Sequence, residues 1–466
     1  MHDPRSRSSN SFGTCPQGPH VYFCFPASTC TGGFLKRSPY PIGWPGTTPW
    51  SPPPCPPFPP HAESSPAHTP QPPTNVRLLL DAFYEDHRKT LDSLLLNHPL
   101  SSLFWECTRN CNLRCGHCMA PRETWKKEKE LSTGQIKQVL KQFTEDFPAH
   151  TLSTLAISGG EPLLRKDICE IIAYATQLGF DISLSTNGCL MGKNTGLIDA
   201  LVKAGLTRSC FSFDGPENHH DFARGAKCFG DVVNAIQYFV KRYPYCGLQT
   251  GTMVTRYNLS MLDETFSLLE ELGVREAQFG RVLPLGRAPA DPMNFLSAGE
   301  LGSLLQWIAE KKRLFHAGKT RLSINFTDDG WCGRACDGIG LEGLVQDEPF
   351  ICTAGLTMAT IHYDGMLGAC LSLPHSLSHQ GNLLVRRPGD IWRNEFKKFR
   401  NRSWLHQGPC LQCGEWAYCR GGGIHQRDDN GGLRECPYLK LRESFSGAKE
   451  HGGITGSVAP IKAAHN

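Results

Sequence analysis

Three cysteines lie close together in the segment Cys111-Asn112-Leu113-Arg114-Cys115-Gly116-His117-Cys118. Three thiolates separated by three and then two residues can each bind one corner of a cubane iron-sulfur cluster, and no fourth cysteine follows at cluster spacing. One iron would then be open to a further ligand. The alternative is a structural zinc site, which normally has four ligands in paired Cys-x-x-Cys knuckles. We interpret His117 as a surface imidazole and not as a ligand.

A second group of cysteines lies in the C-terminal part of the chain. Its members are Cys352, Cys370, Cys410, Cys413, Cys419 and Cys436, with Cys332 and Cys336 upstream. Cys410, Cys413, Cys419 and Cys436 would also provide the four ligands of a tetrahedral zinc site. Soft thiolates in several groups, one of which leaves a position open, suit electron transfer, for which zinc has no use. We therefore favour iron-sulfur clusters over zinc in both regions.

Composition narrows the class of protein. The 466 residues include 21 cysteines, but the N-terminus begins Met1-His2-Asp3-Pro4 without the apolar run of a signal peptide. The thiols are therefore expected to be metal ligands in a reducing cytoplasm. A net charge of only +4 shows no footprint of a nucleic-acid-binding protein. No apolar stretch of 18 residues exists, which argues against a membrane span.

Strand-like and helical segments alternate through the middle of the chain. Strands are predicted at 103–108, 155–158, 180–185, 209–213, 248–254 and 276–283. Apolar residues at helical spacing fill most gaps, over 136–147, 168–178, 229–240 and 261–272. This alternation predicts an α/β fold with a parallel sheet and right-handed crossovers. Periodicity alone leaves a partial barrel and a doubly wound sheet open.

Polar motifs follow three of these strands. Ser158-Gly159-Gly160-Glu161-Pro162 follows the second strand, Ser185-Thr186-Asn187-Gly188 the third, and Ser212-Phe213-Asp214-Gly215 the fourth, which continues into His220 to Gly225. Each motif alone could be an ordinary turn, and the first could be a strand-to-helix turn with proline at the helix start. In barrel folds, chemistry gathers at the carboxyl ends of the strands. Motifs in this order therefore reinforce one another.

The cysteine triplet and the motifs that follow it resemble the radical S-adenosylmethionine (SAM) superfamily. The resemblance implies a partial (β/α)6 barrel in which the open iron of a 4Fe-4S cluster chelates SAM and delivers one electron to it. The products are methionine and a 5′-deoxyadenosyl radical that takes hydrogen from substrate. The implied cluster ligands are Cys111, Cys115 and Cys118, and the implied SAM contacts are Gly159, Gly160, Glu161, Pro162, Ser185, Asn187, Ser212 and Arg224.

The C-terminal cysteines resemble the SPASM extension of that superfamily, which houses auxiliary iron-sulfur clusters. The resemblance implies a distal cluster held by Cys410, Cys413, Cys419 and Cys436. A glycine, Gly423, stands where the family has a further cysteine of the cluster nearer the barrel. We expect Cys332 and Cys336 to complete that cluster with Cys352 and Cys370. The alternatives are a three-cysteine cluster with an open iron, or loss of this cluster.

The SPASM branch acts mostly on peptides and proteins. Leu371 follows Cys370, whereas anaerobic sulfatase-maturing enzymes have an aspartate after the corresponding cysteine. This difference disfavours formylglycine formation. The connection from Gly381 to Arg402 is similar to that of maturases of ribosomally made peptides, and haem-biosynthesis relatives share a similar one. We expect an oxidoreductase or maturase that oxidises or cross-links a peptide or protein side chain, with flavodoxin or ferredoxin as electron donor. Alternatives are a small-molecule substrate such as a tetrapyrrole, and a metal-binding scaffold without catalysis.

The predicted organisation has five parts. A Pro-rich leader over 1–75 has too little apolar surface to fold and is predicted to be disordered. The barrel spans 76–298, a bridging helix and linker 299–331, the Cys-rich domain 332–440 and a flexible tail 441–466. The sequence identifies no catalytic base. Arg281, near the end of the sixth strand, is a candidate for the wall of the cofactor or substrate site, although a solvated charge is the more common case. Asp328, Asp329 and His375 are interpreted as solvated side chains.

Overall fold

A computed structural model describes residues 74–120, 129–327, 331–332 and 350–447, with no side-chain description for 74–80 and 443–447. Residues 1–73 of the predicted leader, Cys336, Asp328 and Asp329 lie outside these residues, and the last two leader residues begin a helix. No helix within the described part of the chain is both long and apolar enough to cross a membrane.

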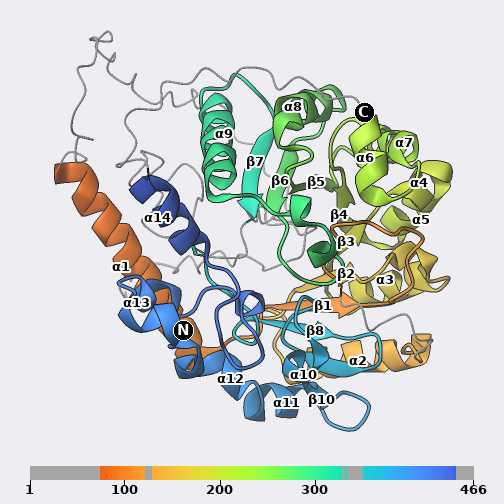
Figure 1. The fold of residues 1–466 in the computed structure, drawn as a ribbon. Helices are drawn as coiled ribbons and strands as arrows, with labels where there is room; N and C mark the ends of the chain where they lie inside the picture. Colours follow the sequence, from red (N-terminus) through yellow and green to blue (C-terminus); the bar gives the residue numbers. More distant parts are fainter. Residues whose placement is uncertain (1–73, 121–128, 328–330, 333–349, 448–466) are drawn as a thin grey trace, which may run out of the picture.

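One mixed sheet forms the centre of the molecule (Figure 1). Its strands are β1 (Ser102–Glu106), β2 (Thr154–Ser158), β3 (Asp181–Thr186), β4 (Leu206–Ser212), β5 (Gly247–Val254), β6 (Glu276–Arg281), β7 (Ser323–Thr327), β8 (Met358–Ile361), β9 (Met366–Gly368) and β10 (His379–Asn382). Their order is β10-β9-β8-β1-β2-β3-β4-β5-β6-β7. Neighbours from β8 through β7 are parallel, whereas β9 is antiparallel to β8 and to β10. The predicted α/β class and partial barrel are confirmed.

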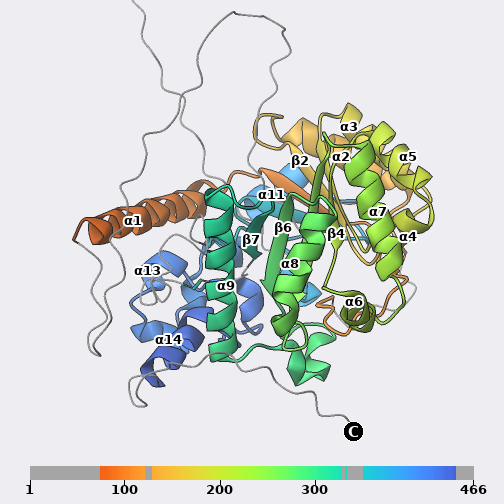
Figure 2. The same cartoon turned by 90° about the horizontal axis from the view of Figure 1, so that it is seen from above.

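Helices connect the successive parallel strands, and further helices precede β1 or follow β9. They are α1 (Thr74–Asn97), α2 (Thr133–Asp146), α3 (Ile168–Gln177), α4 (Cys189–Lys193), α5 (Gly196–Ala204), α6 (Glu217–Arg224), α7 (Phe229–Arg242), α8 (Leu262–Glu271), α9 (Ala298–His316), α10 (His375–Ser378), α11 (Pro388–Asn394), α12 (Lys397–Arg400), α13 (Trp416–Cys419) and α14 (Pro437–Gly447). Capping boxes start α2, at Ser132 and Gln135, and α9, at Ser297 and Glu300. Figure 2 shows α3, α5, α7, α8 and α9 in an arc around one side of the sheet.

The two faces of the sheet differ in polarity. Residues that are paired between neighbouring parallel strands lie on the same face, so the register of the strands assigns each residue to a face. One face is mainly apolar and includes Leu103, Trp105, Leu155, Ile157, Ile182, Leu184, Phe211, Ala277, Phe279 and Ile324, with Ser209, Thr250 and Thr252 among them. It packs against the arc of helices, as the ring contacts of Phe211 with Phe239 of α7 and of Phe279 with Trp307 of α9 show. The opposite, inner face carries small and polar residues, among them Ser183, Ser185, Cys210, Ser212, Gln249, Gly251, Gln278, Gly280 and Asn325.

The sheet extends beyond the six predicted strands at both ends. β7 lies in the segment predicted as a linker and pairs in parallel with β6. β8 belongs to the Cys-rich C-terminal part and pairs in parallel with β1, so the barrel and this part share one sheet. Helix α14 continues to Gly447, past the predicted boundary at 440, and packs against α9. The C-terminal part is therefore held against the barrel by both a strand and a helix.

Candidate functional site

The cysteine triplet lies in the loop that leaves the carboxyl end of β1. Cys115 is buried, and Cys111 and Cys118 are partly buried. Arg287, from the loop after β6, fixes this segment by donating from Nε to the Cys115 carbonyl at 3.0 Å and from its backbone N–H to the Cys118 carbonyl at 2.8 Å. Hydrogen bonds from the loop after β6 therefore hold the cysteine loop in place.

The thiols of this loop are close enough to influence each other's ionisation. Burial, together with the neighbouring thiols of Cys115 and Cys118, raises the pKa of the Cys111 thiol to about 11. Burial also raises the pKa of Cys115. Gathering thiolates in one buried place is unfavourable unless a positive centre offsets their charge. Three soft donors in this environment fit an iron-sulfur cluster bound through three corners.

The Gly-Gly-Glu-Pro loop after β2 packs directly on the cysteine loop. A Cβ on Gly159 would lie 2.3 Å from the Thr108 carbonyl oxygen, and one on Gly160 would lie 2.2 Å from that of Asn110. The Gly160 N–H donates to Thr108 O, and the Glu161 N–H donates to Asn110 O, each at 2.7 Å. The glycines are therefore required by the contact between two backbones.

Glu161 is buried where β2 and β3 end. One carboxylate oxygen accepts from Thr186 Oγ1 at 2.9 Å and from the Leu163 N–H at 3.1 Å, and the other accepts from the Asn187 N–H at 2.8 Å. Burial raises the pKa of Glu161 to about 7 although these hydrogen bonds oppose it. A carboxylate has about four acceptor positions, so three donors leave capacity for a ligand. Pro162 starts the 3-10 helix η2 (Pro162–Leu164), as the ordinary-turn alternative also expected.

A buried ion pair lies on the other side of the triplet. The Asp214 carboxylate lies 2.7 Å from Arg224 Nε, and Arg224 Nη1 donates toward Cys115 Sγ at 3.8 Å. Burial would raise the pKa of Asp214, but Arg224 and His117 hold it at about 2. The prediction of a surface imidazole at His117 is wrong. Its ring is buried 3.7 Å from Asp214, and this burial lowers its pKa to about 4.

The inner face of the sheet provides a polar lining beside these loops. Ser185 and Ser212 both lie on it, near the carboxyl ends of β3 and β4. Both side-chain amide atoms of Gln249, and Nε2 of Gln278, are buried without a hydrogen-bond partner among the residues that the structure describes. Unpartnered buried polar atoms are costly, so this face fits a polar ligand such as SAM. Of the predicted contacts, Asn187 also donates from Nδ2 to Asn112 of the cysteine loop at 2.8 Å.

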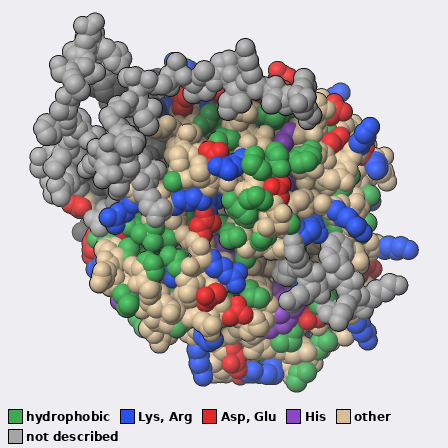
Figure 3. Space-filling view, in the orientation of Figure 1, with side chains coloured by type: hydrophobic (Ala, Val, Ile, Leu, Met, Phe, Trp, Pro, Cys, Tyr) green, Lys and Arg blue, Asp and Glu red, His purple; other side chains and the backbone are tan. Residues whose placement is uncertain are grey.

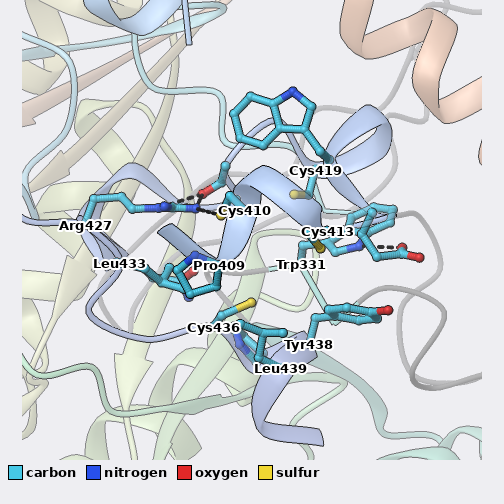
Figure 4. Close-up of a pocket in the computed structure, with 16 residues that line it drawn as sticks. Trp331, Pro409, Cys410, Cys413, Cys419, Arg427, Leu433, Cys436, Tyr438 and Leu439 are labelled. Atoms are coloured by element: carbon cyan, nitrogen blue, oxygen red, sulfur yellow. Dashed lines mark hydrogen bonds between the residues drawn. The ribbon is translucent and has the colours of Figure 1, made fainter. Parts of the chain in front are cut away.

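Four C-terminal cysteines line one pocket (Figure 4). They are Cys410, Cys413, Cys419 and Cys436. Burial and the other three thiols raise the pKa of Cys419 to about 12, and burial raises that of Cys436 to about 11. Arg427, a buried cation that sequence reasoning missed, donates from Nη2 to Cys410 Sγ at 3.2 Å. This donor set fits a cysteine-ligated cluster whose charge is partly offset by Arg427.

The cysteines predicted for the cluster nearer the barrel are Cys332, Cys336, Cys352 and Cys370, and they come from separate segments of the chain. Cys352 precedes β8, Cys370 follows β9, and both are buried, as is Cys332. Cys336 is outside the described residues. Gly423, at the position of the missing cysteine, has φ −70° and ψ 125°, a conformation that any L-residue adopts. The backbone there does not require glycine.

The interpretation of Arg281 and His375 as solvated side chains is wrong. Arg281 is buried at the end of β6 and lies 2.8 Å from Glu435, next to Cys436. His375 is half-buried beside His362 and His379. Arg281 gives no local signal, because its partner Glu435 comes from a distant part of the chain. The partners of His375 lie within 13 residues of it, so the spacing of the three histidines could have indicated the cluster.

Comparisons with known proteins agree with this geometry. Residues 105–269 match the model of the radical SAM superfamily, and residues 352–414 match that of the SPASM iron-sulfur cluster-binding domain. An AdoMet-dependent heme synthase of Methanosarcina barkeri is 31% identical over 72% of this chain and 95% of its own length. Mycofactocin maturase MftC of Mycobacterium ulcerans is 28% identical over 69% of this chain and 82% of its own length.

A solved structure has the same fold. Streptococcus suis SuiB, bound to the precursor peptide SuiA, superposes with a TM-score of 0.59 at 15% identity, covering 80% of this chain and 83% of SuiB. Together these matches do not support the alternative of a scaffold without radical chemistry. The chain belongs to the radical SAM superfamily of enzymes, whose cofactors are SAM and a 4Fe-4S cluster, and it carries a SPASM domain, which binds auxiliary iron-sulfur clusters.

Proposed function

We propose that this enzyme abstracts hydrogen from a side chain of a ribosomally made peptide or protein, which is thereby oxidised or cross-linked. The observation that carries the proposal is the meeting of three thiols, the Glu161 carboxylate and the polar inner face at the carboxyl end of the sheet. Bound there, the cluster and SAM supply a one-electron cleavage that gives methionine and the 5′-deoxyadenosyl radical.

The chain's own residues bind and orient these groups. Cys111, Cys115 and Cys118 would hold three irons, and the remaining acceptor capacity of Glu161 would receive the ammonium of SAM. Because Glu161 is already fixed by Thr186 and Asn187, it needs no reorganisation to do so. Gly159, Gly160 and Pro162 shape the loop that presents Glu161. Ser185, Asn187, Ser212 and Arg224 are proposed as the further SAM contacts.

The SPASM part is proposed to hold two auxiliary clusters. Cys410, Cys413, Cys419 and Cys436 would bind the distal one, and Cys332, Cys336, Cys352 and Cys370 the one nearer the barrel. Clusters of this kind can take up the surplus electron after hydrogen abstraction. A flavodoxin or ferredoxin is the proposed source of the first electron.

A peptide substrate is supported by the mycofactocin maturase relatives, which match more than two thirds of this chain at 27–28% identity. The connection from Gly381 to Arg402 is similar in maturases of ribosomal peptides and in haem-biosynthesis relatives, so it favours neither substrate. The second candidate is a tetrapyrrole. It is favoured by the haem synthase at 31% identity and by a Fe-coproporphyrin III synthase of Methanosarcina barkeri at 30% identity over 68% of this chain.

The two substrates can be separated by isotope transfer. The reconstituted enzyme is incubated with SAM and dithionite, and with either a deuterated precursor peptide, where a short reading frame next to this gene encodes one, or deuterated Fe-coproporphyrin III. Hydrogen abstraction from the true substrate places deuterium in 5′-deoxyadenosine, which mass spectrometry detects. Deuterium from the peptide alone would support the proposal. Deuterium from the porphyrin alone would make the tetrapyrrole the substrate.

A further inference from the structure

Three histidines converge at the edge of the sheet where β1 and β8 end. His362 directly follows β8, His375 begins α10, and His379 begins β10. One ring nitrogen of each lies within 4.8 Å of one ring nitrogen of each of the others. Figure 3 shows histidine side chains at the surface in the lower part of this face, where Figure 1 draws α10. None of the three belongs to the predicted cluster ligands.

We propose that His362, His375 and His379 bind a divalent transition-metal ion of the Zn²⁺ type, with a fourth position open to water or to a carboxylate. Three imidazoles with one open position are a common ligand set for such ions. Tetrahedral Zn²⁺ with Zn–N bonds of 2.0–2.1 Å needs nitrogens roughly 3.4 Å apart. The rings of His375 and His379 stack with their centroids 4.1 Å apart, so metal binding requires at least one of these half-buried rings to turn until its nitrogen points at the ion.

The surroundings of His362 favour a ligand role. Its Nδ1 lies 2.8 Å from Glu106 Oε2 at the end of β1. A carboxylate that accepts from one ring nitrogen fixes the tautomer and leaves the lone pair on the other, as in many metal sites. That other nitrogen, Nε2, lies 3.2 Å from the Ser378 hydroxyl, which would give way to the ion.

The other two histidines also have a nitrogen available. His379 Nε2 is buried and has no hydrogen-bond partner within the described part of the chain, which is unfavourable unless a ligand meets it. His375 contacts the Arg109 guanidinium through Nε2, which leaves Nδ1 for the ion. Arg109 is itself paired with Glu106 at 3.3 Å and lies over the Tyr363 ring, so its charge is partly offset.

A carboxylate next to the three histidines favours a bound cation. Glu106 adds negative charge next to the ion, which offsets part of the charge that a divalent cation brings.

The test uses the enzyme with its iron-sulfur clusters reconstituted, so that cluster cysteines are occupied. One equivalent of Zn²⁺ is added, unbound metal is removed, and zinc content and the zinc X-ray absorption fine structure are measured. We expect about one zinc per chain with only nitrogen and oxygen neighbours near 2.0–2.1 Å. Zinc that is not retained, or zinc with sulfur neighbours near 2.3 Å, would overturn the proposal.

Matched variants assign the ligands. His379→Gln should weaken zinc binding at least about 100-fold, and Glu106→Gln about 10- to 100-fold, as is typical when the hydrogen-bond partner of a ligand is lost. His150→Ala, at an exposed histidine outside the triad, should not change it. Iron content and circular dichroism establish that each variant is folded. Unchanged zinc affinity in folded His379→Gln would overturn the assignment.

Discussion

Asp214 and Arg224 form a buried ion pair directly beside Cys115. The side chain of Asp214 is 0% exposed and that of Arg224 is 8% exposed, with 2.7 Å between Oδ2 and Nε. Asp214 also accepts from the Met253 N–H of β5 at 3.0 Å, so the pair connects α6 and β5 to the cysteine loop. Sequence reasoning proposed Arg224 as a SAM contact but gave Asp214 no role. The structure makes Asp214 the residue that fixes Arg224.

Asp214→Asn should therefore destabilise the enzyme strongly. The substitution leaves the Arg224 charge buried without its partner, which typically costs about 3–5 kcal/mol. Equilibrium urea unfolding followed by circular dichroism would measure the change. The double variant Asp214→Asn, Arg224→Gln should recover part of the loss, because no charge remains unpaired. Glu85→Gln, in an exposed pair with Arg88, is the control and should leave the urea midpoint nearly unchanged.

The raised pKa of Glu161 predicts that SAM binding depends on pH. With a pKa of about 7 in the free enzyme, Glu161 is protonated below that pH and must ionise to pair with the SAM ammonium. SAM affinity should then fall about tenfold between pH 8 and pH 6. Calorimetric titration with SAM at several pH values would measure it.

Glu161→Gln provides the control for this pH dependence. It should bind SAM more weakly at pH 8, because no carboxylate meets the ammonium, and its affinity should change little between pH 8 and pH 6. An equal pH dependence in this variant would assign the titration to another group.

Iron content tests which cysteine replaces the cluster ligand that is absent at Gly423. If Cys336 completes the cluster nearer the barrel, Cys336→Ala should lose about four irons per chain. Adding Gly423→Cys should restore them, because the backbone at Gly423 accepts any L-residue. Cys246→Ala, a partly buried cysteine outside all predicted ligand groups, is the control. Full iron content in Cys336→Ala would leave Cys336 without a role in the cluster.

The sequence predicted those strands and helices that have a regular pattern of apolar residues. All six predicted strands are present with ends shifted by at most three residues, because alternating apolar periods determine them. β7, β8, β9 and β10 were not predicted as members of the sheet. β9 and β10 are only three and four residues long, and β8 pairs with β1 across some 250 residues of sequence, which no local pattern reports.

In the candidate site too, local motifs were predictable and contacts between distant segments were not. The positions of Cys111, Glu161 and Asn187 at the carboxyl ends of strands follow from motif order. The burial of His117 and of Arg281 does not, because it depends on Asp214 and Glu435, which other elements supply. Gly159 and Gly160, implied as SAM contacts, also let their loop approach Thr108 and Asn110 closely, a contact that the motif did not predict.

The central claim is that Cys111, Cys115 and Cys118 hold the cluster that cleaves SAM. The most direct measurement compares the anaerobically reconstituted enzyme with its Cys→Ala triple variant at these positions, for iron content and for release of 5′-deoxyadenosine from SAM with dithionite. The variant should lose about four irons, keep those of the auxiliary clusters, and release no 5′-deoxyadenosine. Release of 5′-deoxyadenosine by the triple variant would contradict the account.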